Sequence, residues 1–220
     1  MVEKSRGLET TNREPFVITI SRQRGSGGAY IGVRLATRLD ISCFDREIIQ
    51  EAAQRLDMSE STIVSRDEIV TTLWRSLLTA SANKSGQPYV PPPLNMPTDN
   101  VLYQTEADIM LEIAKQTSAV IVGRGGSHVL RGHPRHMSVF LHADIAFRKQ
   151  RIRQMYNLSE ERALGIIHSS DESRASYLHM ITGKDWENAR QYHICLDTGV
   201  LGLGRVEDII VAAAHERFGV

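Results

Sequence analysis

The chain has 220 residues, 41% of them hydrophobic and 24% charged, which suits one α/β domain with a small accessory lobe. Its 26 basic and 26 acidic residues cancel, so no overall basic field draws it to nucleic acid or to an anionic membrane. No apolar run approaches membrane-spanning length and the N-terminus has no apolar signal stretch, so we expect a cytoplasmic protein.

The first elements are a tail, a strand, a glycine turn and a helix. Residues 1–14 are polar and of mixed charge, which predicts a disordered tail ahead of one domain at 15–220. The β-branched run at 16–20 predicts a strand buried on both faces, as in a parallel sheet. A glycine-rich turn at 24–28 comes next, and apolar residues then recur every four positions through 31–39, the pattern of a helix.

Strands and helices continue to alternate along the rest of the chain. Further strands are predicted at 41–44, 118–122, 137–142 and 192–196. Asp45, Asp144 and Ser159 stand at predicted helix starts, and other helices are expected at 100–116 and 206–214. A proline-rich loop at 81–98 interrupts the pattern. The alternation predicts a parallel five-stranded sheet with helices on both faces.

Two cysteines lie far apart, each in or beside an apolar segment. Cys43 and Cys195 have no metal-ligand spacing. The prediction is therefore two buried thiols in a reducing compartment.

The glycine turn between strand and helix is the first candidate site. Such a turn aims backbone N–H groups and a helix N-terminus at an anion, although a tight turn that needs positive φ would look the same. Against the pattern G-x-x-x-x-G-K-[ST], Gly28 stands where the lysine is expected and Ala29 where the hydroxyl is. The candidate phosphate-binding residues are Arg22, Arg24, Gly25, Ser26, Gly27 and Gly28, with Ser26 also the nearest hydroxyl for Mg²⁺.

Several segments together carry a family resemblance. In chain order they are ITISRQ at 18–23 with GSGG at 25–28, FDREII at 44–49, IVGRG at 121–125, TGKDW at 182–186 and VLG at 200–202. This ordered set resembles the cytidylate kinase-like family of P-loop nucleoside monophosphate kinases. The resemblance implies a three-layer P-loop core, a helical acceptor-binding insert at about 45–117 and a mobile lid at about 148–185.

The resemblance also implies an activity. It is transfer of the γ-phosphoryl group of ATP, with Mg²⁺, to a nucleoside monophosphate, CMP or dCMP being the first expectation. The acceptor candidates are Asp45, Arg46 and Arg124; the catalytic candidates are Arg148, Arg151, Arg174 and Lys184, with Lys184 standing in for the missing loop lysine. Each has a structural alternative: a helix cap for Asp45, a paired turn arginine for Arg124, a solvated face for the lid arginines and a helix start for Lys184.

Two other functions stay open at this point. Without the usual lysine, hydroxyl and acid, the chain also fits a nucleotide-binding regulatory protein with little catalysis. A kinase of a non-nucleotide small molecule is the third reading. A homodimer through the helices at 58–116 is a further expectation, with nucleotides rather than nucleic acid or membrane as partners.

Overall fold

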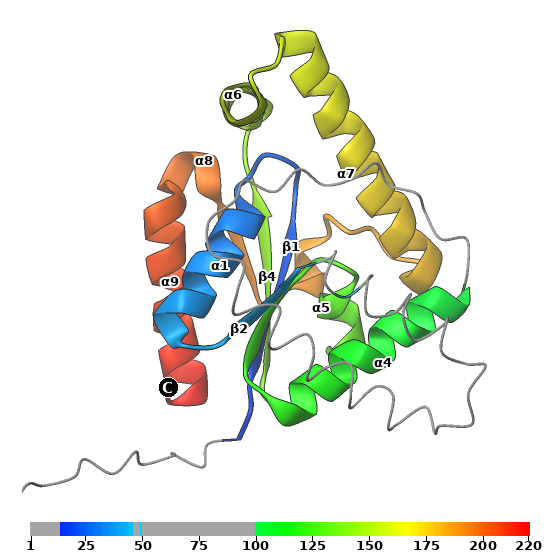
Figure 1. Cartoon of the computed structure of the whole chain (residues 1–220), viewed down its shortest axis with the longest axis vertical. Coiled ribbons are helices and arrows are strands. Elements are labelled where there is room, and N and C mark those ends of the chain that lie inside the picture. Colours follow the sequence, from blue (N-terminus) through cyan, green and yellow to red (C-terminus); the bar gives the residue numbers. More distant parts are fainter. Residues whose placement is uncertain (1–13, 46–48, 50–99) are drawn as a thin grey trace, which may run out of the picture.

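A computed structural model describes residues 14–45, 49 and 100–220 of the chain (Figure 1). The predictions for residues 1–13, for Arg46 and for the proline-rich loop at 81–98 lie outside these ranges, as does most of the proposed insert and dimer surface.

A parallel sheet forms the centre of the molecule. In the described part it has five strands in the order β2-β3-β1-β4-β5. The first strand, β1 (Val17–Arg22), pairs with β3 (Ala119–Val122) on one side and with β4 (His136–His142) on the other. Strands β2 (Ser42–Asp45) and β5 (Ile194–Asp197) complete the sheet. The predicted α/β fold with a parallel five-stranded sheet is therefore confirmed.

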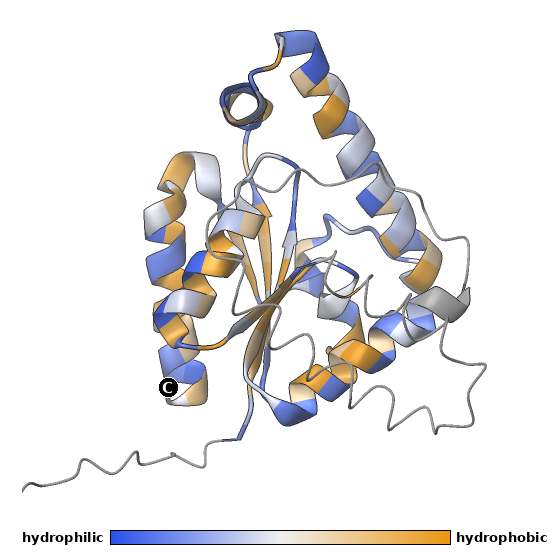
Figure 2. Ribbon diagram, viewed as in Figure 1, coloured by the Kyte–Doolittle hydropathy of each residue, from blue (hydrophilic) through white to orange (hydrophobic). Residues whose placement is uncertain are grey.

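Helices cover both faces of the sheet (Figure 1). Helices α1 (Gly28–Leu39) and α9 (Leu203–Phe218) bury one face, where Ile18 and Ile20 of β1 lie fully inside the core. Helices α4 (Asn100–Gln116) and α5 (Gly126–Val129) lie on the other face, against Val17 and Ile121. Figure 2 shows the apolar residues concentrated on the strands and on the helix sides that face them. Both faces of β1 are thus covered, as its continuous apolar run predicted.

Two further helices stand beyond the carboxyl ends of the strands (Figure 1). Asp144 caps α6 (Ile145–Tyr156) by accepting a hydrogen bond from the N–H of Ala146 at 2.6 Å. Ser159 caps α7 (Glu160–Thr182) in the same way, accepting from the N–H of Arg162. Both caps were predicted, because a cap depends on residues only two or three positions apart. The range 148–185 proposed as a lid contains most of α6 and all of α7.

Short elements complete the carboxyl-terminal part: η1 (Ala189–Gln191) before β5 and α8 (Thr198–Leu201) after it. No helix among the described residues combines the length and the apolar character that crossing a membrane requires.

The prediction of two buried thiols is wrong for Cys195, which is exposed, while Cys43 is half-buried. Cys195 belongs to β5, the outermost strand beside β4 in the described sheet. Its neighbours Ile194 and Leu196 pack on the α1–α9 face, so Cys195 points to the opposite side. For Cys43, burial and the Asp45 carboxylate raise the thiol pKa to about 12.

Candidate functional site

The loop at residues 23–28 joins the end of β1 to the start of α1. Gly25 and Gly27 have φ values of 88° and 89°, a left-handed conformation that favours glycine. A β-carbon on Gly27 would stand 2.6 Å from Cδ2 of Leu203, so the loop also lacks room for a side chain there. Gly27 is the N-cap of α1, and the first turn of that helix has no acidic residue. The loop therefore presents a helix N-terminus suited to an anion.

Ser26 is turned into this loop rather than out of it. The residue is fully buried, and its hydroxyl donates a hydrogen bond to the carbonyl oxygen of Gln23 at 2.9 Å. Within the described residues, no group of three or more His, Cys, Asp or Glu side chains is arranged to hold a metal ion. In this conformation the Ser26 side chain is thus enclosed in the loop.

Arg22 brings positive charge to the edge of the loop. Its Cγ atom would stand 2.6 Å from a β-carbon on Gly28, and its guanidinium lies against Gly123, which follows β3. Glycine at both positions therefore leaves the space that the Arg22 side chain fills. This charge lies between the glycine loop and the turn that carries Arg124.

Arg151 of α6 is the cation that lies directly over the loop. Its guanidinium carbon is 3.7 Å from the place of a β-carbon on Gly27. Burial lowers the pKa of Arg151, an effect that Tyr30 and Tyr156 oppose. Its Nε atom is buried without a hydrogen-bond partner, and no carboxylate in the described part of the chain pairs with it. A half-buried cation beside a helix N-terminus is an arrangement that favours a bound anion.

Asp171 of α7 holds the loop, α6 and α7 together. One of its oxygens accepts from the backbone N–H of Arg24 at 2.6 Å and from Arg174 at 3.0 Å. The other accepts from Arg148 at 2.6 Å. Arg148 also donates to the carbonyl oxygens of Ala143, at 2.9 Å, and of Arg24, at 3.3 Å. Arg148 and Arg174 therefore anchor the loop in this arrangement.

The Arg24 side chain leaves the loop and packs on α6. It donates to the hydroxyl of Tyr156 at 3.1 Å, and its guanidinium carbon lies 5.6 Å from the centre of that ring. This cation–π contact explains the position of Arg24 without a ligand.

Arg124 was expected at the acceptor side and lies at the turn after β3. It adopts φ 54° and is buried, with Nη2 3.2 Å from Oε1 of Glu106 on α4. Tyr177 of α7 donates to the other Glu106 oxygen at 3.1 Å, and the Arg124 guanidinium lies 5.7 Å from the Tyr177 ring centre. Burial, with the Glu106 carboxylate, raises the pKa of Tyr177. The arginine thus joins α4, α7 and the end of β3.

Asp45 lies at the same edge of the sheet. It is the last residue of β2 and pairs in register with Val122, two residues before Arg124. Carboxyl ends of parallel strands are where open α/β sheets bind ligands. The structure therefore places Asp45 and Arg124 on neighbouring strand ends, beside the glycine loop of β1.

Lys184 is exposed and follows the end of α7. It is close enough to His128 of α5 to help lower that ring's pKa, after the larger effect of burial. Glu187, three residues further on, contacts the loop: its carboxylate accepts a hydrogen bond from the side-chain amide of Gln23 at 2.8 Å. Trp186 between them is buried against Phe140. Glu187 was not predicted from the sequence. Its position directly after the TGKDW segment was the one available indication.

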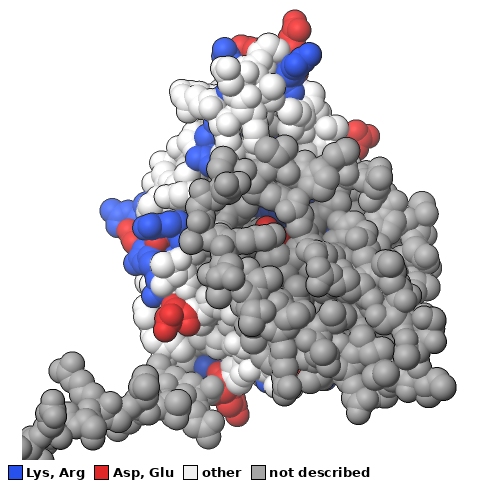
Figure 3. Space-filling view, viewed as in Figure 1, with Lys and Arg blue, Asp and Glu red and all other residues white. Residues whose placement is uncertain are grey.

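Charged side chains at the α6–α7 end of the molecule alternate in sign on the face shown in Figure 3. Glu160 of α7 pairs with Lys149 and lies 3.8 Å from Arg153, both on α6.

Comparison with known proteins identifies a family. The model of the family described as "Cytidylate kinase-like family" matches residues 17–200. None of the curated proteins matches the chain.

Solved structures show the same fold. An uncharacterized protein from Eubacterium ventriosum has a TM-score of 0.69 at 20% identity, covering 92% of this chain and 99% of its own. A gluconokinase from Sinorhizobium meliloti has a TM-score of 0.50 at 13% identity, covering 94% of this chain and 95% of its own. These likenesses show that the chain shares its overall fold with both structures.

Proposed function

The chain belongs to the cytidylate kinase-like family, and from that premise we propose that it transfers the γ-phosphoryl group of ATP to a nucleoside monophosphate. CMP and dCMP are the first acceptors to test. One observation carries the proposal: the guanidinium of Arg151 lies over Gly27 of the glycine loop with no carboxylate partner among the described residues. A phosphate group at the start of α1 would supply the missing negative charge.

Phosphoryl transfer needs positioning and positive charge more than covalent help from the protein. In our proposal the loop N–H groups, the start of α1 and Arg151 hold the ATP phosphates, with Arg22 between donor and acceptor. Arg148 and Arg174 act as positioning residues, because Asp171 already binds both. Mg²⁺ enters as part of the ATP complex, since the loop hydroxyl of Ser26 is turned inward.

The acceptor would approach the edge marked by Asp45 and Arg124. Here Arg124 is neutralised by Glu106, so it would contact a base or sugar through its remaining donors or exchange Glu106 for a phosphate. Helices α6 and α7 would then exclude water from the transferring group. Lys184 would contact the transferred phosphate only if the segment after α7 moved toward the loop.

A second function is favoured by one specific observation. Gly28 occupies the position where the phosphate-loop pattern has a lysine, so the loop lacks a cation that commonly stabilises the transferred phosphate. A regulatory protein that binds a nucleotide without transferring phosphate would keep the anion site and lose the chemistry.

A coupled assay with ATP and Mg²⁺ tests the proposal against a panel of nucleoside monophosphates, with gluconate as a non-nucleotide acceptor. Arg151→Gln should lower kcat/KM by about 100-fold, the effect of removing one strong contact to transferring charge. The matched control is Arg153→Gln on the same helix, whose side chain is 49% exposed. We expect it to retain nearly full activity.

The same proteins are used to measure ATP binding by calorimetry. If the protein binds ATP, Arg151→Gln weakens that binding, and no acceptor is turned over, the regulatory function would be favoured over the kinase function. Turnover with gluconate alone would show that the acceptor is a non-nucleotide small molecule rather than a nucleoside monophosphate. Turnover unaffected by Arg151→Gln would contradict the assignment of Arg151.

A further inference from the structure

Arg24 of the glycine loop is held by the α6–α7 pair at three places. Its backbone N–H donates to a carboxylate oxygen of Asp171 at 2.6 Å, and its carbonyl oxygen accepts from Arg148 at 3.3 Å. Its guanidinium donates to the hydroxyl of Tyr156 at 3.1 Å. Asp171 lies on α7 and the other two residues lie on α6, so both helices are tied to the same residue of the loop.

The backbone N–H of Arg24 has a charged acceptor, unlike two other N–H groups of the loop. The N–H of Gln23 donates to the carbonyl oxygen of Leu141, and that of Ser26 donates to the carbonyl oxygen of Gln23. The Arg24 bond, at 2.6 Å, is shorter than the roughly 2.9–3.0 Å usual for N–H donors, as expected when the acceptor is ionised. The loop therefore already binds an anion, and that anion is a side chain of the protein itself.

A phosphate group at the glycine loop would compete with Asp171. Phosphate and carboxylate are both negative, and like charges a few ångströms apart repel strongly where little water screens them. The Asp171 side chain is only 18% exposed. Helix α6 adds a carbonyl dipole, since a β-carbon on Gly25 would stand 2.8 Å from the carbonyl oxygen of Arg148. In the observed arrangement, the two helices thus bring negative charge to the loop.

Two other contacts of Asp171 lie within the α6–α7 pair itself. Asp171 accepts from Arg148 of α6 at 2.6 Å and from Arg174 of α7 at 3.0 Å. The two helices also share an apolar cluster of their own, which includes Ile152 and Ala163. This cluster is separate from those on the two faces of the sheet. The pair can therefore leave the loop as a unit, with its internal contacts intact.

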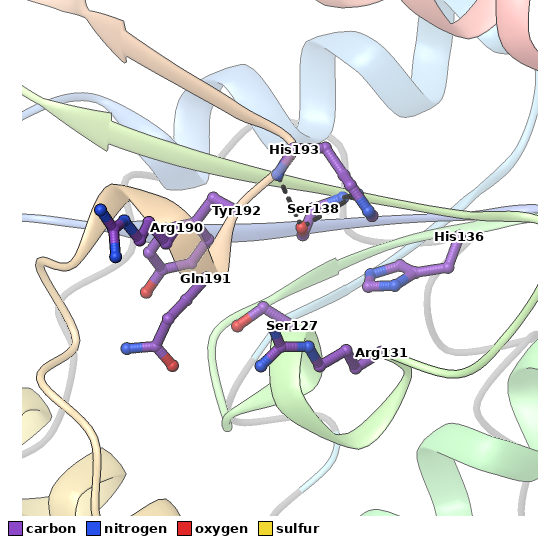
Figure 4. A pocket seen from close by; sticks show the side chains of 8 residues that line it. All are labelled: Ser127, Arg131, His136, Ser138, Arg190, Gln191, Tyr192 and His193. Carbon is purple, nitrogen blue, oxygen red and sulfur yellow. Dashed lines mark hydrogen bonds between the residues drawn. The ribbon is translucent and has the colours of Figure 1, made fainter.

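The carboxyl end of α7, in contrast, is fixed to the sheet. Leu178 belongs to an apolar cluster with Phe140 of β4 and Tyr192. Next to Tyr192, the backbone N–H of His193 donates to the hydroxyl of Ser138 at 3.1 Å, a bond drawn in Figure 4. Apolar packing thus holds the pair at this end, while polar contacts hold it at the loop. Such polar contacts can be exchanged for those of a charged ligand.

We propose that the α6–α7 pair is a latch on the glycine loop: the Asp171 carboxylate takes the place of a ligand on the N–H of Arg24, and an incoming nucleotide displaces it. This inference rests on the proposed function for the binding of ATP phosphates at the loop, and it does not depend on phosphoryl transfer. The latch lowers the apparent affinity for nucleotide to the fraction of molecules in which it is open. Nucleotide then binds only at concentrations high enough to open it.

Calorimetric titration of the full chain with ATP and Mg²⁺, and separately with inorganic triphosphate and Mg²⁺, tests the latch. Asp171→Asn removes its charge and should tighten binding of both ligands by about tenfold, as expected if the latch is open in about a tenth of the molecules. Tyr156→Phe removes another contact of Arg24 without changing the net charge and should tighten both by about threefold. A residue that only supported the loop would have the opposite effect.

Two control variants separate the latch from general effects. Glu172→Gln removes one negative charge at the next position of α7, where the side chain is exposed. Tyr30→Phe removes the hydroxyl of a second tyrosine near Arg151, one that is 52% exposed. Neither control should change the affinity by more than about twofold, because solvent and salt screen exposed groups. Circular dichroism verifies the fold of every variant, and Tyr156→Phe decides alone if Asp171→Asn does not fold.

The latch is overturned if Asp171→Asn binds no more tightly than Glu172→Gln, or Tyr156→Phe no more tightly than Tyr30→Phe. It is also overturned if the affinity for ATP responds and that for triphosphate does not, because the effect would then lie at the base or sugar. Either result leaves the proposed kinase function standing. Tighter binding without turnover of any acceptor supports the latch and contradicts phosphoryl transfer. If no protein binds either ligand, the loop is not a phosphate site and both proposals fall.

Discussion

The carboxylate of Asp171 accepts a hydrogen bond from the backbone N–H of Arg24 at 2.6 Å, which ties helix α7 to the glycine loop. A carboxylate therefore already accepts one of the backbone N–H groups that this loop could offer to a bound anion. The same side chain binds Arg148 and Arg174, so three elements depend on one residue.

The Asp171→Asn variant should therefore lose stability. Its amide keeps the size of the carboxylate but removes the charge that two arginines share, and charge-assisted hydrogen bonds are worth about 1.5–3 kcal/mol. We expect the free energy of unfolding in urea to fall by about 2 kcal/mol. Asp208→Asn is the control, because Asp208 forms an exposed pair with Arg38. Equal losses in the two variants would refute the anchoring role.

Gly27→Ala should destabilise the loop through its backbone. The residue has φ 89°, which costs a side-chain-bearing residue about 1–3 kcal/mol, and Leu203 occupies the space of the new methyl group. Gly165→Ala, inside α7 with nothing within 4 Å, should instead stabilise by about 0.5–1 kcal/mol. Thermal unfolding of both variants measures the contrast. A Gly27→Ala protein as stable as the original would mean that the loop adopts another conformation.

Glu106→Gln should remove the carboxylate that pairs with the buried guanidinium of Arg124. The carboxylate side chain is 1% exposed and that of Arg124 is 4% exposed. Removing one partner of a buried pair costs about 3–5 kcal/mol. Glu112→Gln on the same helix, where the carboxylate pairs with the exposed Lys115, should cost less than about 1 kcal/mol. Urea unfolding of the two variants gives both values; a small loss at Glu106 would show that water or another group compensates Arg124.

Acid should destabilise the protein through His136. Burial lowers the pKa of this ring to about 4, with smaller effects from His193, His133 and Arg217 that the Leu130 carbonyl partly offsets. Its unfolded value is 6.5, so the unfolded chain binds the proton first and stability falls as the pH drops from 6.5 to 4. The full loss is about 3 kcal/mol.

His136→Gln should flatten this acid dependence, measured as the free energy of unfolding at several pH values between 4 and 7. Glutamine keeps a hydrogen-bonding group near the Thr19 hydroxyl but does not titrate. Exposed His168→Gln on α7 is the control and should leave the dependence unchanged. The same slope in the His136 variant would assign the acid sensitivity to other groups.

Local patterns were sufficient for most of the architecture. The β-branched run before the glycine loop predicted β1, and Asp144 and Ser159 predicted the starts of α6 and α7. Each of these features depends on residues within one turn or one strand, where backbone geometry and side-chain chemistry act directly. The glycine loop was recognisable for the same reason.

Contacts between distant residues were beyond the reach of such patterns. The Asp171–Arg24 bond joins positions 147 residues apart, and the Tyr177–Glu106 bond joins positions 71 apart. Cys195 was expected inside because its neighbours are apolar, yet its strand lies outermost next to β4. Sequence periodicity indicates which side chains share a face, and it does not tell which faces another element covers.

By itself, the sequence determined an α/β chain with a parallel sheet, a glycine loop before a helix and a set of arginines able to serve phosphate chemistry. The tertiary structure decided their contacts: Arg151 lies over the loop, whereas Arg148 and Arg174 are bound to Asp171 and Arg124 to Glu106. The physical reason is that a guanidinium group is neutralised only by an anion within a few ångströms. Folding sets that distance, so it separates the arginines paired with carboxylates from Arg151, which has no carboxylate partner in residues 14–45 and 100–220.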